Sequence, residues 1–95
     1  MEKEKFVEFI TVETTRDLKK EIENSNKPVM IDLYADWCVA CKELEKYTFS
    51  DPKVSMILSQ FKLIKFDITS TNEDHFKYLK SMRIFGPPAL FFYDL

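Results

Sequence analysis

The sequence is poor in cysteine and histidine, the usual ligands of structural zinc. Among its 95 residues are two cysteines, Cys38 and Cys41, and one histidine, His75. A structural zinc site takes four ligands, mostly of these two kinds, so this count disfavours a zinc site. A purely structural disulfide is also disfavoured, because a bridge between cysteines so close in sequence closes too short a loop to add much stability.

Two further absences narrow the class of protein. No segment is long and apolar enough to span a bilayer, and the charged residues 1–5 are too few to begin a signal peptide. No basic cluster stands out and the formal net charge is -2, which disfavours a surface for nucleic acid or an anionic membrane. On these features alone the protein would be cytosolic, and its partner would be another protein rather than a small molecule.

The sequence does contain enough apolar material for one hydrophobic core. Hydrophobic residues make up 45% of the chain and aromatic residues 15%, with nine Phe. A chain of 95 residues suits one domain, and it shows no internal repeat, linker or low-complexity segment. We therefore predict a single domain spanning residues 1–95.

Strand-like and helix-like segments alternate along the chain. Apolar, β-branched and aromatic runs predict strands at 6–12, 28–35, 61–68 and 89–93. Helical periodicity predicts helices at 14–24, at 38 to about 47 or 49, at 52–59, and a last one that follows residue 72. The expected capping residues are Thr14, Ser50 or Asp51, and Thr71 or Asn72. In the last helix we expect Phe76, Leu79 and Met82 to face the core and His75 to face solvent. The alternation implies parallel crossovers and a sheet covered on both faces, with residues 28–35 as a central strand.

The segment Cys38-Val39-Ala40-Cys41 lies where the apolar strand gives way to a helical pattern. At a helix N-terminus, unpaired N–H groups favour an anion, so we expect Cys38 to ionise more readily than a free cysteine, whose pKa is about 8.5. Cys41, one helical turn deeper, suits the resolving partner in a two-step exchange. A C-x-x-C that follows a strand and opens a helix is typical of a thioredoxin-like redox site.

Residues 29–52 (VMIDLYADWCVACKELEKYTFSDP) resemble the C-terminal periplasmic domain of the DsbD family of thiol:disulfide interchange proteins, in the thioredoxin superfamily. Ordinary thioredoxins are less similar, since they have Gly-Pro where this chain has Val39-Ala40. A looser resemblance runs from about Phe6 to Tyr93. It implies a thioredoxin-like α/β fold with a central mixed sheet flanked by helices. One more antiparallel strand and a closing helix would follow in that fold, so we expect a C-terminally truncated domain whose 89–93 edge is open to self-association.

The resemblance also implies an activity. The domain would be a protein-disulfide reductase that receives electrons from the membrane domain of DsbD and passes them to its N-terminal domain, serving disulfide isomerisation and cytochrome c maturation. It would face the periplasm at the inner membrane, and the exchange needs no bound cofactor. The alternatives are a free thioredoxin, a cytochrome c maturation reductase, and a redox-inactive peptide-binding module on the same fold.

Two acidic residues are candidates for tuning the dithiol. In thioredoxins the residue corresponding to Asp32 is a buried carboxylate beneath the active site, and burial without a partner would raise its pKa and make it a proton acceptor for Cys41. The alternative is an acid solvated at the strand end. Glu45 lies on the same side of the helix as both cysteines and could form an acidic pair with Asp32. Its alternative is a surface acid paired with a neighbouring lysine, Lys42 or Lys46.

Four further residues are candidates for contacting a partner. Trp37 corresponds to the tryptophan before the first cysteine of thioredoxins, and Tyr34 flanks the same thiol, although it could be merely structural. Pro88 corresponds by its spacing to the family's cis-proline, which lies against the disulfide, and Pro87 could expose backbone for pairing with an extended partner. The alternative for this Pro-Pro pair is a simple turn leading into the strand.

Overall fold

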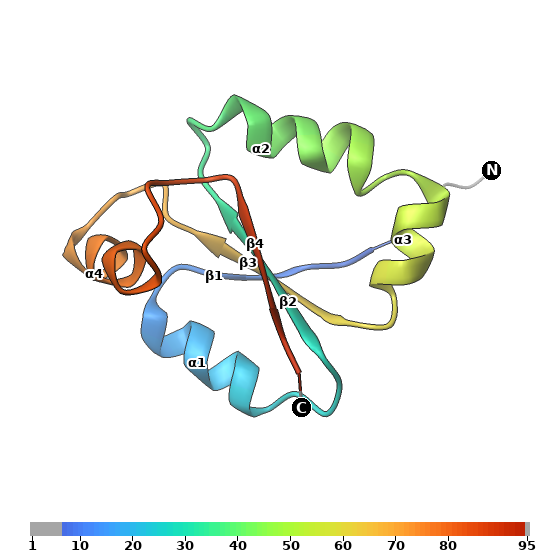
Figure 1. Ribbon diagram of the computed structural model, residues 1–95, viewed down its shortest axis with the longest axis horizontal. Coiled ribbons are helices and arrows are strands. Elements are labelled where there is room, and N and C mark those ends of the chain that lie inside the picture. Colours follow the sequence, from blue (N-terminus) through green and yellow to red (C-terminus); the bar gives the residue numbers. More distant parts are fainter. Residues whose placement is uncertain (1–6, 95) are drawn as a thin grey trace.

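A mixed four-stranded sheet organises the protein (Figure 1). The computed structural model describes residues 7–94, and within this range the strand order is β1-β3-β2-β4. The elements follow the chain as β1 (Ile10–Val12), α1 (Thr15–Glu23), β2 (Val29–Tyr34), α2 (Val39–Glu43), the π-helical turn η1 (Leu44–Thr48), α3 (Pro52–Leu58), β3 (Lys62–Asp67), α4 (Glu73–Met82) and β4 (Ala89–Tyr93).

The central position predicted for residues 28–35 is confirmed, since β2 lies between β3 and β4. Every residue of β2 is buried, as a near-continuous apolar run requires. β3 runs parallel to both β1 and β2, whereas β4 runs antiparallel to β2. The alternation of elements alone did not predict this reversal, but it gives the mixed sheet that the family resemblance implied.

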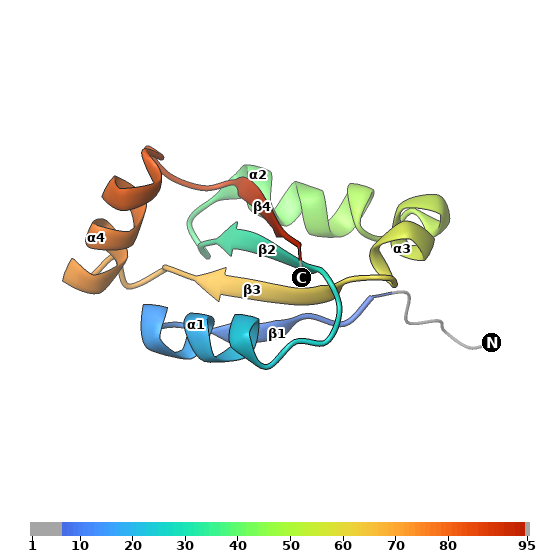
Figure 2. The same ribbon diagram turned by 60° about the horizontal axis from the view of Figure 1, so that its bottom comes forward.

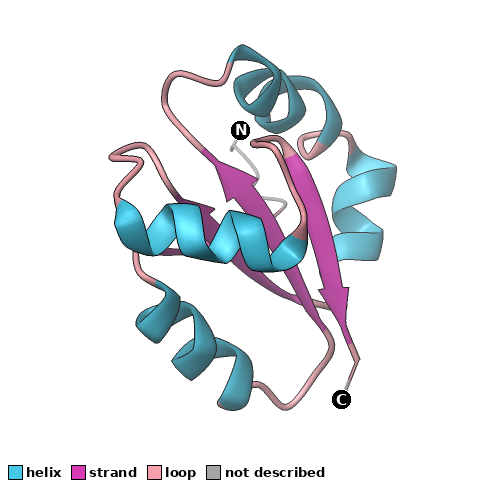
Figure 3. Ribbon diagram, turned by 60° about the vertical axis from the view of Figure 1, so that its left-hand side comes forward, coloured by secondary structure: helices cyan, strands magenta, loops and turns pink. Residues whose placement is uncertain are grey.

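Helices cover both faces of the sheet (Figures 2 and 3). Because side chains alternate along a strand, odd-numbered residues of β2 pack with α1 and α4, where the core includes Leu18, Ile31, Phe66 and Leu79. Even-numbered residues face the other side, where Met30 packs with Phe49 and Leu58. Asp32 is even-numbered, so it lies on the face covered by α2, η1 and α3.

Local capping sets three helix starts where the sequence predicted them. The hydroxyl of Thr14 accepts from Asp17 N–H, and the Asp51 carboxylate accepts from Lys53 N–H, at the N-caps of α1 and α3. At α4, Asn72 and His75 form a reciprocal capping box. β1 is shorter than predicted, and Phe6 lies outside the described residues.

The predicted orientation of α4 is wrong in two respects. His75, expected at the surface, is 1% exposed; its Nε2 lies 2.6 Å from the Glu13 carbonyl oxygen and its ring packs edge-on against Phe66. Phe76, expected in the core, is instead exposed. Leu79 is buried as predicted, so the helix packs on the core with His75 in the place expected for Phe76. The histidine can be buried there without loss of hydrogen bonds, because both of its ring nitrogens have backbone partners.

The β4 strand forms an outer edge of the sheet within the described chain. Its odd-numbered residues, such as Phe91, pack against the core that includes α1 and α4. Leu90 and Phe92 project to the opposite face and remain 39% and 60% exposed. This face is therefore only partly covered at β4.

Candidate active site

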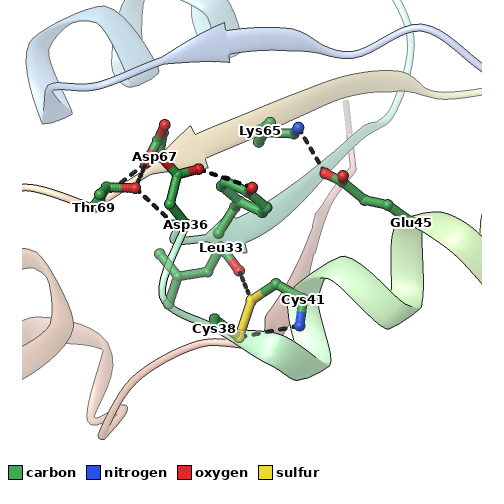
Figure 4. Close-up of a disulfide and its surroundings, with 9 residues drawn as sticks. Leu33, Asp36, Cys38, Cys41, Glu45, Lys65, Asp67 and Thr69 are labelled. Carbon is green, nitrogen blue, oxygen red and sulfur yellow. Dashed lines mark hydrogen bonds and ion pairs between the residues drawn. A yellow bond between two sulfur atoms is a disulfide. The ribbon is translucent and has the colours of Figure 1, made fainter.

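The two cysteines form a disulfide at the start of α2 (Figure 4). Cys38 is the N-cap, and the Cys41 N–H points at its sulfur from 3.1 Å. The Cα atoms are 5.3 Å apart, as a bridge requires. Cys38 is 6% exposed and Cys41 1%, so the predicted order of an outer and an inner sulfur is confirmed. The Cys41 N–H thus lies against the outer sulfur, and the easier ionisation expected of Cys38 stays a prediction.

The inner sulfur lies against the central strand, which pairs with the strand that follows the proline turn. Cys41 Sγ is 3.7 Å from the carbonyl oxygen of Leu33, and Leu33 pairs with Ala89, the first residue of β4. The Pro87–Pro88 peptide that leads into Ala89 is cis. The cis-proline that the resemblance implied is therefore present and enters the sheet beside the strand that touches the disulfide. Its role in holding a partner stays a prediction.

Asp32 is a buried carboxylate without compensation by hydrogen bonds. It is 1% exposed, and neither of its oxygens has a hydrogen-bond partner among residues 7–94. The pKa of Asp32 is raised to about 7, mainly by burial and in smaller part by the negative charge of Glu45, while the positive charge of Lys65 opposes both. The alternative of an acid solvated at the strand end is thus excluded, whereas its part in the reaction stays a prediction.

Glu45 pairs with a lysine from a strand rather than from its own helical segment. Its carboxylate lies 2.6 Å from the ammonium group of Lys65 in β3, rather than pairing with Lys42 or Lys46 (Figure 4). Lys65 stands opposite Asp32 in the strand register, and its Nζ lies 4.4 Å from the centre of the Tyr34 ring. The structure therefore brings Asp32 and Glu45 into one electrostatic group, of which Lys65 is the third member. The sequence feature that could have indicated this electrostatic group is Lys65 itself, a lysine between apolar residues of a strand.

The aromatic residues before Cys38 occupy different environments. Tyr34 is buried, and its hydroxyl donates to Asp36 Oδ1 over 2.9 Å. Burial, together with the hydrogen bond to Asp36 and the charge of its carboxylate, raises the pKa of the Tyr34 hydroxyl to about 12. Trp37 is 54% exposed, and its indole Nε1–H donates to the carbonyl oxygen of Thr69. Trp37 is thus open to contact with a partner, whereas Tyr34 belongs to the support beneath the site.

Comparison with known proteins identifies this arrangement. The profile of a family described as thioredoxin-like matches residues 12–94, which include the whole site. The chain belongs to the thioredoxin-like family. Within this family, the chain is similar to DsbD proteins. The thiol:disulfide interchange protein DsbD of Pectobacterium atrosepticum is 48% identical over 86 residues. That match covers 90% of this chain and 15% of the relative, so the chain spans only a small part of the curated relatives it matches.

Two solved structures support the same assignment. The C-terminal domain of Neisseria meningitidis DsbD in its oxidised form has a TM-score of 0.71 and 33% identity, covering 90% of this chain and 76% of that domain. Its reduced form has a TM-score of 0.68 and 36% identity, covering 81% and 71%. The resemblance to the DsbD C-terminal domain that residues 29–52 indicated is confirmed, together with the thioredoxin-like fold.

The described residues hold no other obvious chemical centre. No group of three or more His, Cys, Asp and Glu side chains in this part of the chain is placed to hold a metal ion. None of the helices between residues 7 and 94 is long and apolar enough to cross a membrane.

Proposed function

We propose that this domain is a thiol-disulfide oxidoreductase that relays two electrons through Cys38 and Cys41, as the C-terminal domain of a DsbD-type reductant transporter. The observation that carries the proposal is the bridge itself, with an outer sulfur at a helix start and an inner sulfur packed on the central strand. The strong similarity to DsbD proteins supports this type of transporter.

The exchange proceeds in two steps that balance sulfur, protons and electrons. The reduced Cys38 thiolate attacks one sulfur of a partner disulfide, and the other partner sulfur leaves as a thiolate that takes a proton. Cys41 then loses its proton and attacks Cys38 Sγ, which releases the second partner thiolate and forms the Cys38–Cys41 disulfide. The partner gains two electrons, and the domain ends in the bridged form that the structure shows.

Asp32 is the proposed acceptor for the Cys41 proton. Its pKa of about 7 lies near neutral pH, where a carboxylate can both take and return a proton. Glu45 and Lys65 adjust that affinity in opposite directions. In this mechanism the two acids affect the second step, in which Cys41 loses its proton, and not the first attack by Cys38.

The proposed partners are other domains of the same transporter. Electrons would arrive from cysteines of the membrane domain and leave to the N-terminal domain, on the periplasmic side of the inner membrane. Support comes from the DsbD relatives, of which this chain matches only about a seventh of the length. The exposed Trp37 and the Pro87–Pro88 turn would form the contact surface beside Cys38.

Trapping the mixed disulfide tests this proposal. A Cys41→Ser variant lacks the resolving thiol, so reduced Cys38 should form a stable mixed disulfide with the oxidised N-terminal domain of a DsbD protein. Cys38→Ser should form none, although its Cys41 thiol is retained. If neither variant is trapped and wild-type protein binds the partner without electron transfer, the domain is a redox-inactive binding module. Equal trapping by both variants would contradict the assigned order of the cysteines.

A further inference from the structure

The turn between β3 and α4 contacts both residues that precede Cys38. The Asp36 N–H donates to the Thr69 hydroxyl oxygen over 2.9 Å, and the indole Nε1–H of Trp37 donates to the Thr69 carbonyl oxygen over 3.2 Å. Figure 4 shows Thr69 beside Asp36, which lies between the end of β2 and Cys38. One residue far away in sequence therefore fixes two neighbours of the reactive sulfur.

Thr69 is itself held in one orientation by Asp67. Its hydroxyl donates to Asp67 Oδ1, and its backbone N–H donates to the same oxygen over 2.9 Å. A hydroxyl has one proton, so donation to Asp67 leaves its lone pairs for the Asp36 N–H. The hydroxyl is thus oriented as an acceptor toward the loop that carries Trp37.

The turn between β3 and α4 contains one residue with a strained backbone conformation. Thr71 has a φ of 50°, in the left-handed region that β-branched residues rarely occupy. Its hydroxyl lies within hydrogen-bond distance of the Ile68 and Thr69 carbonyl oxygens, at 3.3 and 3.2 Å, and can donate its one proton to either. Strained backbone conformations of this kind are concentrated at functional sites. Here the strained residue contacts the same carbonyl group that accepts the Trp37 indole.

We propose that Thr69 is a positioning residue for the exchange reaction, holding the Asp36 backbone and the Trp37 indole in the arrangement that a partner protein meets beside Cys38. This inference rests on the proposed function of the dithiol. A half-exposed Trp fixed before binding loses less conformational freedom when a partner docks. The effect should therefore fall on recognition of a large disulfide substrate, and a small disulfide that touches only the sulfur should be indifferent to it.

The test compares Thr69→Val, which keeps the shape and removes the hydroxyl, with Thr69→Ser, which restores it. Thr15→Val is the matched control, because it removes a similar hydroxyl bond to a carboxylate, Thr15 to Asp74, between α1 and α4. Trp37 is the sole tryptophan, so its fluorescence reports on this loop alone. Each protein is assayed for acrylamide quenching, for reduction of a disulfide-linked peptide, and for reduction of 5,5′-dithiobis(2-nitrobenzoate).

Thr69→Val should increase quenching of Trp37 and raise KM for the peptide about fivefold, the loss expected for about one hydrogen bond, with kcat retained. Its rate with the small disulfide should stay near that of wild type, Thr69→Ser should restore both properties, and Thr15→Val should change neither. Unchanged quenching and peptide KM in Thr69→Val, or equal changes in Thr15→Val, would overturn the inference. Failure of wild-type protein to reduce either disulfide would contradict the proposed function instead, and the quenching comparison would still decide the placement of Trp37.

Discussion

Replacing Asp32 with Asn should make the oxidised domain more stable at alkaline pH, relative to wild type, than at acidic pH. The folded protein raises the pKa of this acid from an ordinary 3.8 to about 7. A buried carboxylic acid with a raised pKa lowers the free energy of unfolding least when it is protonated. Its contribution to stability is therefore full below pH 4, is lost as the pH rises from about 4 to about 7, and stays lost above that.

The size of this effect follows from the shift. One pKa unit corresponds to about 1.4 kcal/mol, so a shift of roughly three units removes up to about 4 kcal/mol of folding free energy when Asp32 ionises. Asn has nearly the same shape and no charge, so it escapes this loss. Any fixed cost of burying the amide is the same at every pH and cancels when the difference between variant and wild type is followed.

The assay is urea unfolding of both oxidised proteins between pH 4 and pH 9, followed by Trp37 fluorescence. The free-energy advantage of the variant should grow by up to about 4 kcal/mol across this range, with most of the change between pH 4 and 7. Asp17→Asn, which removes an exposed carboxylate in α1, is the matched control and should show no growth of this size. An Asp32→Asn advantage that is the same at pH 5 and pH 8.5 would refute the claim that Asp32 is buried with a raised pKa.

Three further outcomes follow from the same contacts. Glu45→Gln should lower the pKa of Asp32, since the Glu45 charge raises it, and Lys65→Met should raise that pKa, because the ammonium group opposes it. The pH midpoint of the Asp32 titration measures both shifts. Shifts of the same sign in the two variants would contradict this electrostatic group. Asn72→Ala should destabilise the domain by about 1 kcal/mol through loss of the α4 N-cap, measured by urea unfolding, with Asn24→Ala as control. Asp32→Asn should also slow release of a mixed disulfide near neutral pH without slowing its formation, in a stopped-flow experiment; equal slowing of both steps would place the acid at Cys38 instead.

The sequence predicted the elements that depend on local signals. Thr14, Asp51 and Asn72 cap helices where their side chains reach the first free N–H groups, and the apolar run before Cys38 is the buried central strand. The dithiol and the burial of Asp32 followed from the change of period at residues 32–41 and from the family resemblance.

The remaining features depend on contacts between distant segments. The sequence pattern predicted one helix from Cys38 to about Tyr47 or Phe49, but α2 ends at Glu43 and a π-helical turn follows. No local propensity marks that turn. The pairing of Glu45 with Lys65 requires the register of β3 against β2, which a single sequence does not give. His75 was misplaced for the same reason, since its buried partner is the Glu13 carbonyl group, 62 residues away.

The central claim is that Cys38 and Cys41 exchange electrons as a reversible pair. The most direct test is equilibration of the domain with a glutathione redox series, followed by Trp37 fluorescence. A single two-electron transition at a reducing potential, near the thioredoxin value of about -270 mV or somewhat above it, is the predicted result. A potential near the strongly oxidising value of about -120 mV, or no transition at all, would contradict the assignment of this domain as an electron donor.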